Sequence, residues 1–355
     1  MFRVRVGFTV ETHSSASLPS KFVAASGIAL GSGLSQDAAE GCYRSGLVQT
    51  RMLITSLKLL LAGLIIFCAF LPCFYSFENV YRPKRPVQGT PQDDGLNYDP
   101  VSLSTSDGEF IRGWFVYGTK GSPLIVACHG VGTNREDLRG VSRFLCKAGF
   151  NVLAFDFRAH GESTGSKTTF GFREALDVQA AVQYAGAHYQ QQFEGVGVYA
   201  ISMGSAAAII AARHMPQVKA FVLDSPFARL EDLVDQQFSH WPLLPRRLFV
   251  SLATFYGSLF TGIQATEIAP EAYAPDLGMR PVLVFHGDQD TLIPIAQGRQ
   301  LFERIPGPKE FVETRGAGHV QSYALMGRAY EERVVGFFRR HLGPATGLAH
   351  SARHP

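Results

Sequence analysis

The sequence predicts an α/β fold in which a mostly parallel central sheet is flanked by helices. Short continuous apolar runs recur along residues 101–342, and stretches with helical periodicity lie between most of them. Strands that are buried on both faces of a parallel sheet have this continuous apolar character, and their alternation with helices indicates such a sheet. The least ordinary polar residues follow directly after these runs, where ligand sites of such sheets gather.

Two strands joined by a hairpin come first. Val101–Ser106 and Phe110–Tyr117 flank Asp107-Gly108, which is a strong turn signal. The buried strands are then predicted at Leu124–Cys128, Val152–Phe155, Val196–Ala200, Ala220–Leu223, Val282–Phe285 and Phe311–Glu313. Between Arg173 and Tyr189 apolar residues recur at intervals of three and four, which predicts a helix, and a similar pattern precedes residue 342.

Composition excludes several classes of protein. Of the 355 residues, 46% are hydrophobic and 18% are charged, which is typical of a chain that folds. The formal charge of +3 comes without any run of Lys or Arg interleaved with aromatic residues, so we expect no nucleic-acid partner. The five cysteines form no CxxC pair and no cluster with histidines, so we expect no metal site.

The N-terminal region contains a candidate membrane anchor. Residues 1–51 are rich in Ser, Ala and Gly, and we expect them to be disordered or to precede a genuine start at Met52. Leu59–Tyr75 carries no charge, and with its apolar flank it approaches the roughly 20 residues that cross a bilayer. We therefore predict a single transmembrane helix over residues 52–77. A cleaved signal peptide and a buried core helix are the alternatives.

The flanks of this segment fit an anchor but leave its orientation open. Tyr75, Phe77 and Tyr81 resemble an aromatic belt. Basic residues are balanced on the two sides, so the side of the membrane on which the rest of the chain lies is not predicted. Residues 78–100 are rich in proline and are interpreted as a linker, and residues 343–355 as a disordered tail.

Ser202 is the candidate nucleophile. It lies at the bend between a predicted strand and an alanine-rich helix, with the small residues Ala200 and Gly204 two positions before and after it. In a nucleophile elbow the turn is so sharp that these two positions must be small, and the backbone N–H after the serine faces the developing oxyanion. Met203 would supply that N–H. The alternative is a serine that merely caps a helix.

The acid and the base follow in the chain order that such a nucleophile requires. Asp290 follows one apolar strand, and His319 follows the next likely strand. His319 would accept the serine proton, and Asp290 would orient the imidazole. Asp288 and Asp224 are competing candidates for the acid.

A second oxyanion donor is expected after the strand Leu124–Cys128. The glycines in His129-Gly-Val-Gly let the backbone approach a substrate, and the N–H of Val131 is the natural donor. We interpret His129 itself as structural. The segment Asp156-Phe-Arg-Ala-His160-Gly-Glu-Ser is expected to organise a loop by hydrogen bonding, with His160 also structural.

Together these motifs resemble the α/β-hydrolase superfamily, most closely the membrane-anchored Bem46-like hydrolases and their bacterial lysophospholipase-like relatives. The resemblance covers about residues 100–342 and rests on four features: His129-Gly130, the Asp156-x-Arg-x-His-Gly-x-Ser segment, the Ser202 elbow, and Gly287-x-x-Asp290-x-x-Ile-Pro with Gly318-His319. It implies the α/β-hydrolase fold over residues 101–342 and ester, thioester or occasionally amide hydrolysis without a cofactor. Ala200 stands where the family usually has glycine.

An insertion after the sixth strand is expected to form a small helical cap over residues 227–273. It is rich in large apolar residues, which are typical of an amphipathic helix pair or of an acyl pocket: Leu230, Leu233, Val234, Phe238, Trp241, Leu244, Phe249, Phe255, Tyr256, Leu259 and Phe260. With a membrane anchor, this favours a serine esterase that acts on acyl or lipid-like small molecules. A peptidase of the same fold and a non-catalytic binding protein remain as alternatives.

Overall fold

The structure, a computed structural model, describes residues 36–190, 193, 195–239 and 245–343. The described residues divide into two units, one that ends at Ala62 and one that begins at Gly63. Helix α1 (Gln36–Val80) begins in the first unit and ends in the second. Everything else described here belongs to the second, globular unit. Trp241 and Leu244 of the predicted cap, and residues 1–35 and 344–355, lie outside the described residues.

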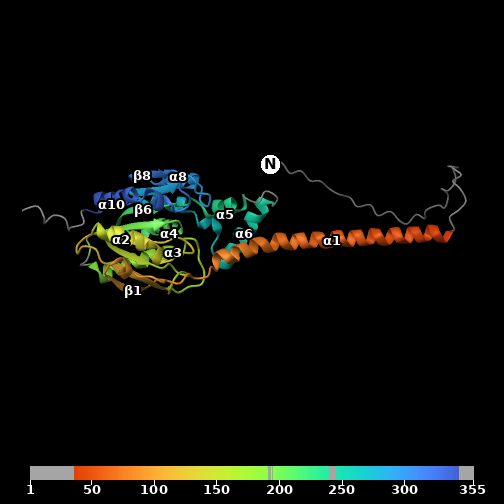
Figure 1. The fold of residues 1–355 in the computed structure, drawn as a ribbon, viewed down its shortest axis with the longest axis horizontal. Helices are drawn as coiled ribbons and strands as arrows, with labels where there is room; N and C mark the ends of the chain where they lie inside the picture. The colour runs from red at the N-terminus through yellow and green to blue at the C-terminus, as the bar shows by residue number, and fades with distance from the viewer. Residues whose placement is uncertain (1–35, 191–192, 194, 240–244, 344–355) are drawn as a thin grey trace, which may run out of the picture. The chain divides into compact units, whose positions relative to one another are not determined.

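The globular unit is built on a mostly parallel sheet, which confirms the predicted fold class. The eight strands lie in the spatial order β1-β2-β4-β3-β5-β6-β7-β8. The two edge strands, β1 and β8, lie on opposite sides of the globular unit (Figure 1). The pairs β1–β2 and β2–β4 are antiparallel, and all other neighbours are parallel. The bounds are β1 Tyr98–Ser104, β2 Phe110–Val116, β3 Leu124–Cys128, β4 Asn151–Phe155, β5 Val196–Ile201, β6 Val218–Asp224, β7 Val282–Gly287 and β8 Lys309–Thr314.

Helices cover both faces of this sheet. The helices are α2 Arg139–Lys147, α3 Glu174–His188, α4 Met203–Ala211, α5 Leu230–Ser239, α6 Arg246–Thr261, α7 Pro270–Tyr273, α8 Ile295–Arg304, α9 Ser322–Met326 and α10 Arg328–Leu342. Short 3-10 turns lie at Pro91–Asp94, Arg135–Leu138, Ala212–His214, Ala265–Glu267 and Ala274–Leu277. One buried cluster joins the sheet to α3, α4 and α8, and a second joins its other face to α2 and α10.

All eight predicted strands are present, and most of them differ from the predicted bounds by one to three residues at an end. The strand β3 matches its prediction, whereas β1 begins at Tyr98 rather than Val101. Tyr98 pairs with Val116 and Pro100 with Trp114, so the hairpin register extends β1 past the apolar run. A proline is tolerated there because β1 is an edge strand.

The N-terminal helix differs from its prediction in length. Residues 36–51, which we expected to be disordered, are the first part of α1. Within the described residues, one helix, Glu40–Val80, is long and apolar enough to cross a membrane by its length and composition. The polar residues 36–51 can continue the helix because it contains good helix formers and no proline before Pro72.

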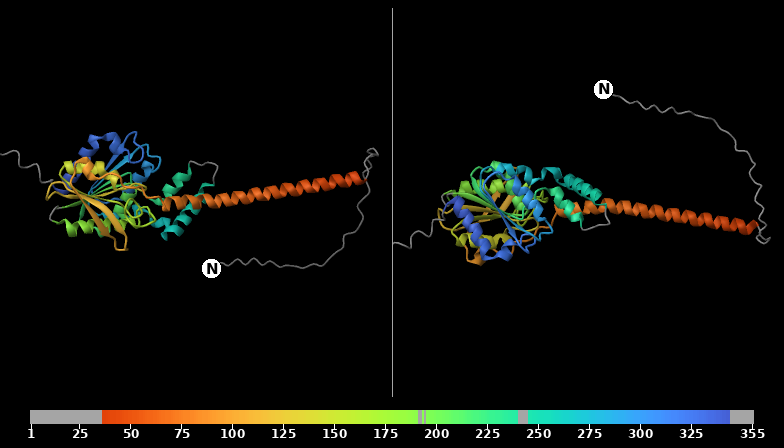
Figure 2. Two further views of the ribbon diagram at one scale, coloured as in Figure 1. Left: turned by 60° about the horizontal axis from the view of Figure 1, so that its bottom comes forward. Right: turned by 90° about the horizontal axis from the view of Figure 1, so that it is seen from above.

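The last turns of α1 are part of the globular unit. Pro72 and Ser76 are buried, and the Ser76 hydroxyl donates a hydrogen bond to the Ala253 carbonyl of α6 at 2.7 Å. The Tyr75 ring packs on Phe238 of α5 with the centroids 5.1 Å apart. Two further views show α6 beside this end of α1 (Figure 2). Tyr75 therefore does not lie in an exposed aromatic belt, as its place in the sequence suggested.

The predicted linker over residues 78–100 is bonded to the globular unit. The Glu136 carboxylate accepts hydrogen bonds from the backbone N–H groups of Gln88 and Gly89, at 3.0 and 3.2 Å. The Asn134 amide donates to the carbonyls of Arg85 and Pro86. These contacts join side chains to backbone across about fifty residues of sequence, so no local pattern indicated them.

Candidate active site

Ser202 lies at the carboxyl end of β5, in a strained turn into α4. Its backbone has φ 51° and ψ −116°, a conformation that L-residues rarely adopt. The turn is held in place because the Ser202 N–H donates to the carbonyl of Asp224, at the end of the neighbouring strand β6, at 2.8 Å. Strain of this kind, at the end of a central strand, is typical of a nucleophile elbow.

Small residues around the turn permit this geometry. A Cβ atom added to Gly204 would come within 2.6 Å of the His129 carbonyl oxygen and 2.8 Å of the Cys128 carbonyl oxygen. Gly204 is therefore required for the close approach of α4 to the loop after β3. Ala200 is fully buried, and its carbonyl accepts a hydrogen bond from the Ser205 hydroxyl at 2.9 Å. An alanine methyl fits at this position.

The structure brings Ser202, His319 and Asp290 together from the ends of β5, β8 and β7. The Nε2 atom of His319 lies 3.0 Å from the Ser202 Oγ, and its Nδ1 atom lies 2.7 Å from Asp290 Oδ2. The Asp290 side chain is fully buried, whereas that of His319 is 22% exposed. This arrangement is the one in which an imidazole can accept a hydroxyl proton while a carboxylate orients the ring.

Asp290 is fixed by its second oxygen. Its Oδ1 atom accepts the backbone N–H groups of Leu292 and Ile293, at 3.0 and 2.8 Å. The oxygen Oδ2 is thereby directed at His319. Of the rival acids, Asp288 accepts the N–H of Gly316 instead, on the surface.

Asp224, the other rival, lies behind the histidine without bonding to it. Its Oδ2 accepts the hydroxyl of Tyr330 at 2.7 Å, and its Oδ1 accepts that of Ser225 at 3.0 Å. The Ser225 hydroxyl in turn accepts the N–H of Val320, next to His319, at 3.2 Å. Burial raises the pKa of Asp224 to about 6. Asp224 thus supports the loop that carries the histidine, a role that the sequence did not indicate.

The two predicted oxyanion donors lie beside the nucleophile. Val131 and Met203 both line the cavity that Ser202 and His319 face. Met203 begins α4, and helix N-termini present free N–H groups that favour negative charge. Val131 belongs to the loop after β3, where a Cβ added to Gly130 would come within 3.5 Å of the Ser202 Cβ.

His129 holds the backbone of this loop. Its Nε2 accepts the N–H of Phe157 at 3.0 Å, so its Nδ1 carries the proton and faces the Gly130 carbonyl at 2.6 Å. Burial lowers the pKa of His129, which keeps the ring neutral. His160 accepts the N–H of Gly132 at 3.1 Å in the same way. Both histidines therefore stand in structural positions, as expected.

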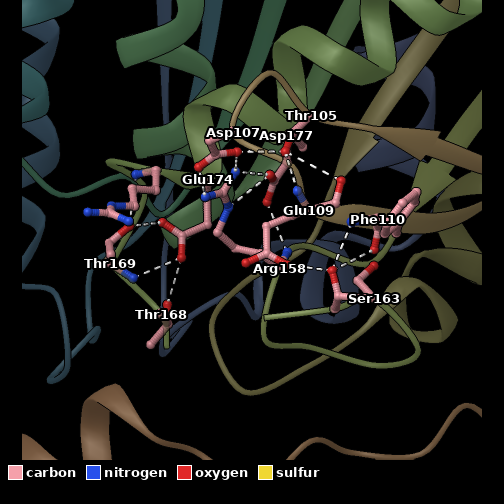
Figure 3. A network of polar contacts seen from close by, with 12 residues as sticks. Thr105, Asp107, Glu109, Phe110, Arg158, Ser163, Thr168, Thr169, Glu174 and Asp177 are labelled. Atoms are coloured by element: carbon pink, nitrogen blue, oxygen red, sulfur yellow. Dashed lines mark hydrogen bonds and ion pairs between the residues drawn. The ribbon is translucent and has the colours of Figure 1, made fainter. Parts of the chain in front are cut away.

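The segment that begins at Asp156 is a hydrogen-bonded loop support. Asp156 is fully buried, accepts the backbone N–H of Arg135 at 2.7 Å and forms an ion pair with its guanidinium. Arg158 bonds to both Asp107 and Asp177 (Figure 3). Its hydrogen bonds lower the pKa of Asp107 to about 2. The hairpin turn, the loop after β4 and α3 are thereby fixed to one another.

A second buried carboxylate shapes the loop beside the nucleophile. Glu174 accepts the backbone N–H groups of Thr169 and Gly171, at 2.8 and 2.9 Å, and both threonine hydroxyls of the loop (Figure 3). The hydroxyl of Thr168 lies 3.3 Å from the Met203 sulfur, and Phe170 of this loop lines the cavity. Sequence reasoning missed this support. The only available signal was a carboxylate within the apolar face of the predicted helix.

A cavity of about 570 Å³ opens onto Ser202 and His319. This volume is typical of a small-molecule site. Most of its walls come from α5, α6, the loops after β3 and β7, and the end of α1. Leu230, Leu233 and Val234 of the predicted cap line it, whereas Phe255 and Leu259 are exposed on the outer face of α6.

The chain was compared with known proteins. Residues 120–277 match the family model described as serine aminopeptidase, S33. The YqkD protein of Bacillus subtilis is 29% identical over 244 residues, which are 66% of this chain and 77% of YqkD. The human protein ABHD12B is 27% identical over 52% of this chain and 50% of its own length. The solved esterase Pf2001 of Pyrococcus furiosus is 29% identical, with a TM-score of 0.63, over 74% of this chain and 98% of the esterase.

Proposed function

Since this chain belongs to the α/β-hydrolase superfamily of serine hydrolases, we propose that it cleaves carboxylic ester or thioester bonds of acyl, lipid-like substrates through Ser202, His319 and Asp290. The observation that carries the proposal is the unbroken contact from Ser202 Oγ to His319 Nε2, at 3.0 Å, and from His319 Nδ1 to Asp290, at 2.7 Å. No cofactor takes part in this chemistry.

The reaction proceeds in two acyl-transfer steps. His319 accepts the Ser202 proton as the Ser202 oxygen attacks the acyl carbonyl carbon, and the carbonyl oxygen becomes an oxyanion. The backbone N–H groups of Val131 and Met203 stabilise that oxyanion. His319 then donates the proton to the leaving alcohol or thiol as its bond to carbon breaks. A water molecule then attacks the acyl carbon while His319 accepts one of its protons. The bond from that carbon to Ser202 Oγ breaks, the acid is released, and His319 returns the proton to Ser202.

The apolar cavity favours an acyl chain as the occupant. Its walls beside the catalytic residues carry Leu230, Val234, Ile263 and Ile268, which cannot satisfy a charged or strongly polar group. The similarity to the Pf2001 esterase points in the same direction. The family description as a serine aminopeptidase keeps hydrolysis of aminoacyl amides as the second candidate activity.

We further propose that α1 anchors the chain in a membrane as a single span. Leu53, Leu60, Ile66 and Phe70 are among the large apolar residues that α1 exposes. Exposed apolar side chains of this size along a helix are stable in lipid and costly in water. The predicted span over residues 52–77 lies within α1.

The test uses the full chain purified in detergent, because Tyr75, Ser76, Asn79, Val80 and Arg82 line the cavity. Hydrolysis of p-nitrophenyl esters of increasing acyl length, an acyl thioester and aminoacyl p-nitroanilides is measured beside Ser202→Ala. We expect ester or thioester hydrolysis that falls on the order of 10⁶-fold in the variant. Preference for the anilides would favour the peptidase. A folded parent that cleaves none of them would refute the proposed reaction.

A further inference from the structure

We propose that the last turns of α1 form one wall of the acyl-chain subsite, so that this helix selects the substrate as well as anchoring the chain. The inference rests on the proposed acyl-ester hydrolysis and adds where the acyl chain binds. The subsite is lined by the C-terminal turns of α1 and by the inner face of α6, two helices that also contact each other, within the globular unit.

One face of α1 lines the cavity. Tyr75, Ser76, Asn79 and Val80 contribute to its wall. Their spacing of one, four and five residues places them on a single side of the helix. Phe74, which directly precedes these positions in sequence, is 49% exposed and does not line the cavity. The helix therefore presents a defined face to the site.

The facing wall is a row of small residues on α6. Ala253, Gly257, Ser258 and Thr261 line the cavity at the same helical spacing. A Cβ atom placed on Gly257 would meet nothing within 4 Å. A larger residue at position 257 would thus extend into open space, where the proposed acyl chain binds.

Several contacts hold the α1 wall in place. The Ser76 hydroxyl bonds to the Ala253 carbonyl at 2.7 Å, and both partners are buried. At the end of α1 the Val80 carbonyl accepts the N–H of Thr168 at 3.0 Å. Thr168 also contacts Met203, the residue after the nucleophile. The wall is therefore fixed both to α6 and to the catalytic loop.

The chemistry of these two faces fits an uncharged chain. None of the cavity-lining residues that α1 and α6 contribute is charged. The charged residues of the cavity outside the triad, Arg82 and Asp137, come from other segments, and Asp137 is paired with Arg85. Several lining residues are polar, but the hydroxyls of Ser76, Thr254 and Thr261 donate to backbone carbonyls, so a flexible alkyl chain beside them leaves these groups paired.

The test fills the subsite from the α6 side. Gly257→Leu in the full chain is expected to lower kcat/KM for p-nitrophenyl decanoate and longer esters about tenfold or more relative to kcat/KM for the acetate. Gly186→Leu is the matched control, because Gly186 also lies within a helix and has open space at its Cβ, outside the cavity. Equal losses for short and long esters would overturn the inference.

A second pair of variants tests the α1 side. Tyr75→Ala is expected to shift the preferred acyl chain to greater length, whereas Phe74→Ala, on the exposed side of the same helix, is expected to leave it unchanged. Melting temperatures of both variants show whether the fold is retained. An unchanged preference for acyl-chain length in a folded Tyr75→Ala chain would contradict the proposal that α1 forms a wall of the subsite.

A ligand-binding measurement tests the subsite independently of the proposed reaction. A fluorescent fatty acid, cis-parinaric acid, is titrated into the Ser202→Ala chain with and without Gly257→Leu. Weaker binding with leucine supports the subsite even where no ester is cleaved. The subsite would be refuted if the parent hydrolyses esters but Gly257→Leu changes neither the binding of the fatty acid nor the chain-length profile. The proposed reaction would not be affected by that result.

Discussion

The candidate catalytic corner, formed by Ser202, Asp290 and His319, and the cavity beside it are assembled from different kinds of segment. Ser202, Asp290 and His319 each follow a strand of one sheet, and β5, β7 and β8 bring their ends to the same edge. Much of the cavity wall comes instead from α1, α5 and α6, and α1 ends at Val80 whereas α5 begins only at Leu230. The proposed chemistry thus depends on short local motifs, whereas the proposed choice of substrate depends on the packing of α1 against helices that are remote from it in sequence.

The largest effect is expected at the acid of the corner. Asp290→Asn should lower kcat about 10⁴-fold, because an amide cannot hold the histidine in the required tautomer. Asp288→Asn is the matched control, since Asp288 lies two residues away and does not contact His319. Steady-state ester kinetics measure both. Similar losses in the two variants would show that activity does not depend on which of the two aspartates contacts His319.

A second prediction concerns the support behind the histidine. The folded pKa of Asp224 is raised to about 6 by burial, above its ordinary value near 4. Its favourable contribution to stability is therefore full below pH 4 and is lost as the pH rises through 6. Relative to Asp224→Asn, the parent should lose up to about 3 kcal/mol of unfolding free energy across this range. Urea unfolding of both proteins from pH 4 to 7 measures this difference, and a constant difference would contradict the prediction.

Gly204→Ala tests the close packing at the elbow. The added methyl group would meet the carbonyls of His129 and Cys128 at 2.6 and 2.8 Å. Because these are backbone atoms, we expect a loss of about 2 kcal/mol in stability and reduced turnover of short and long esters alike. Urea unfolding and the ester panel measure these effects. A change in chain-length preference would instead link the elbow to the cavity.

The smallest effect is expected at the contact between α1 and α6. Ser76→Ala removes one buried hydrogen bond, to the Ala253 carbonyl, and should lower the free energy of unfolding by about 1 kcal/mol. Catalysis of acetate hydrolysis should be retained, because the corner does not touch this contact. Thermal unfolding and acetate kinetics measure the two quantities. A loss of acetate hydrolysis would mean that the corner depends on α1.

The sequence could predict those parts of the site that depend on contiguous motifs, but not those that depend on contacts between remote segments. The elbow motif, the order of Ser202, Asp290 and His319, and the apolar strands are contiguous patterns, so their positions could be predicted. The support from Glu174 and from Asp224 could not, because each depends on a contact between segments far apart in the chain. From the sequence, Asp224 is only a rival candidate for the acid.

The N-terminal region shows the same limit of prediction from sequence. Hydropathy indicated an apolar helix but not that its last turns would pack against α5 and α6. The predicted linker likewise bonds to the loop after β3. Apolar side chains at a helix end satisfy a membrane pattern and a core pattern equally well, so the sequence could not distinguish the two.

By itself, the sequence determined the α/β fold, the order of the strands along the chain, and which serine, histidine and aspartate end them. Those features follow from continuous apolar runs and turn residues, which act locally. The tertiary structure alone decided which acid faces His319 and which helices enclose the cavity. These outcomes depend on the directions of side chains and on contacts between remote segments, and no local pattern of residues encodes them.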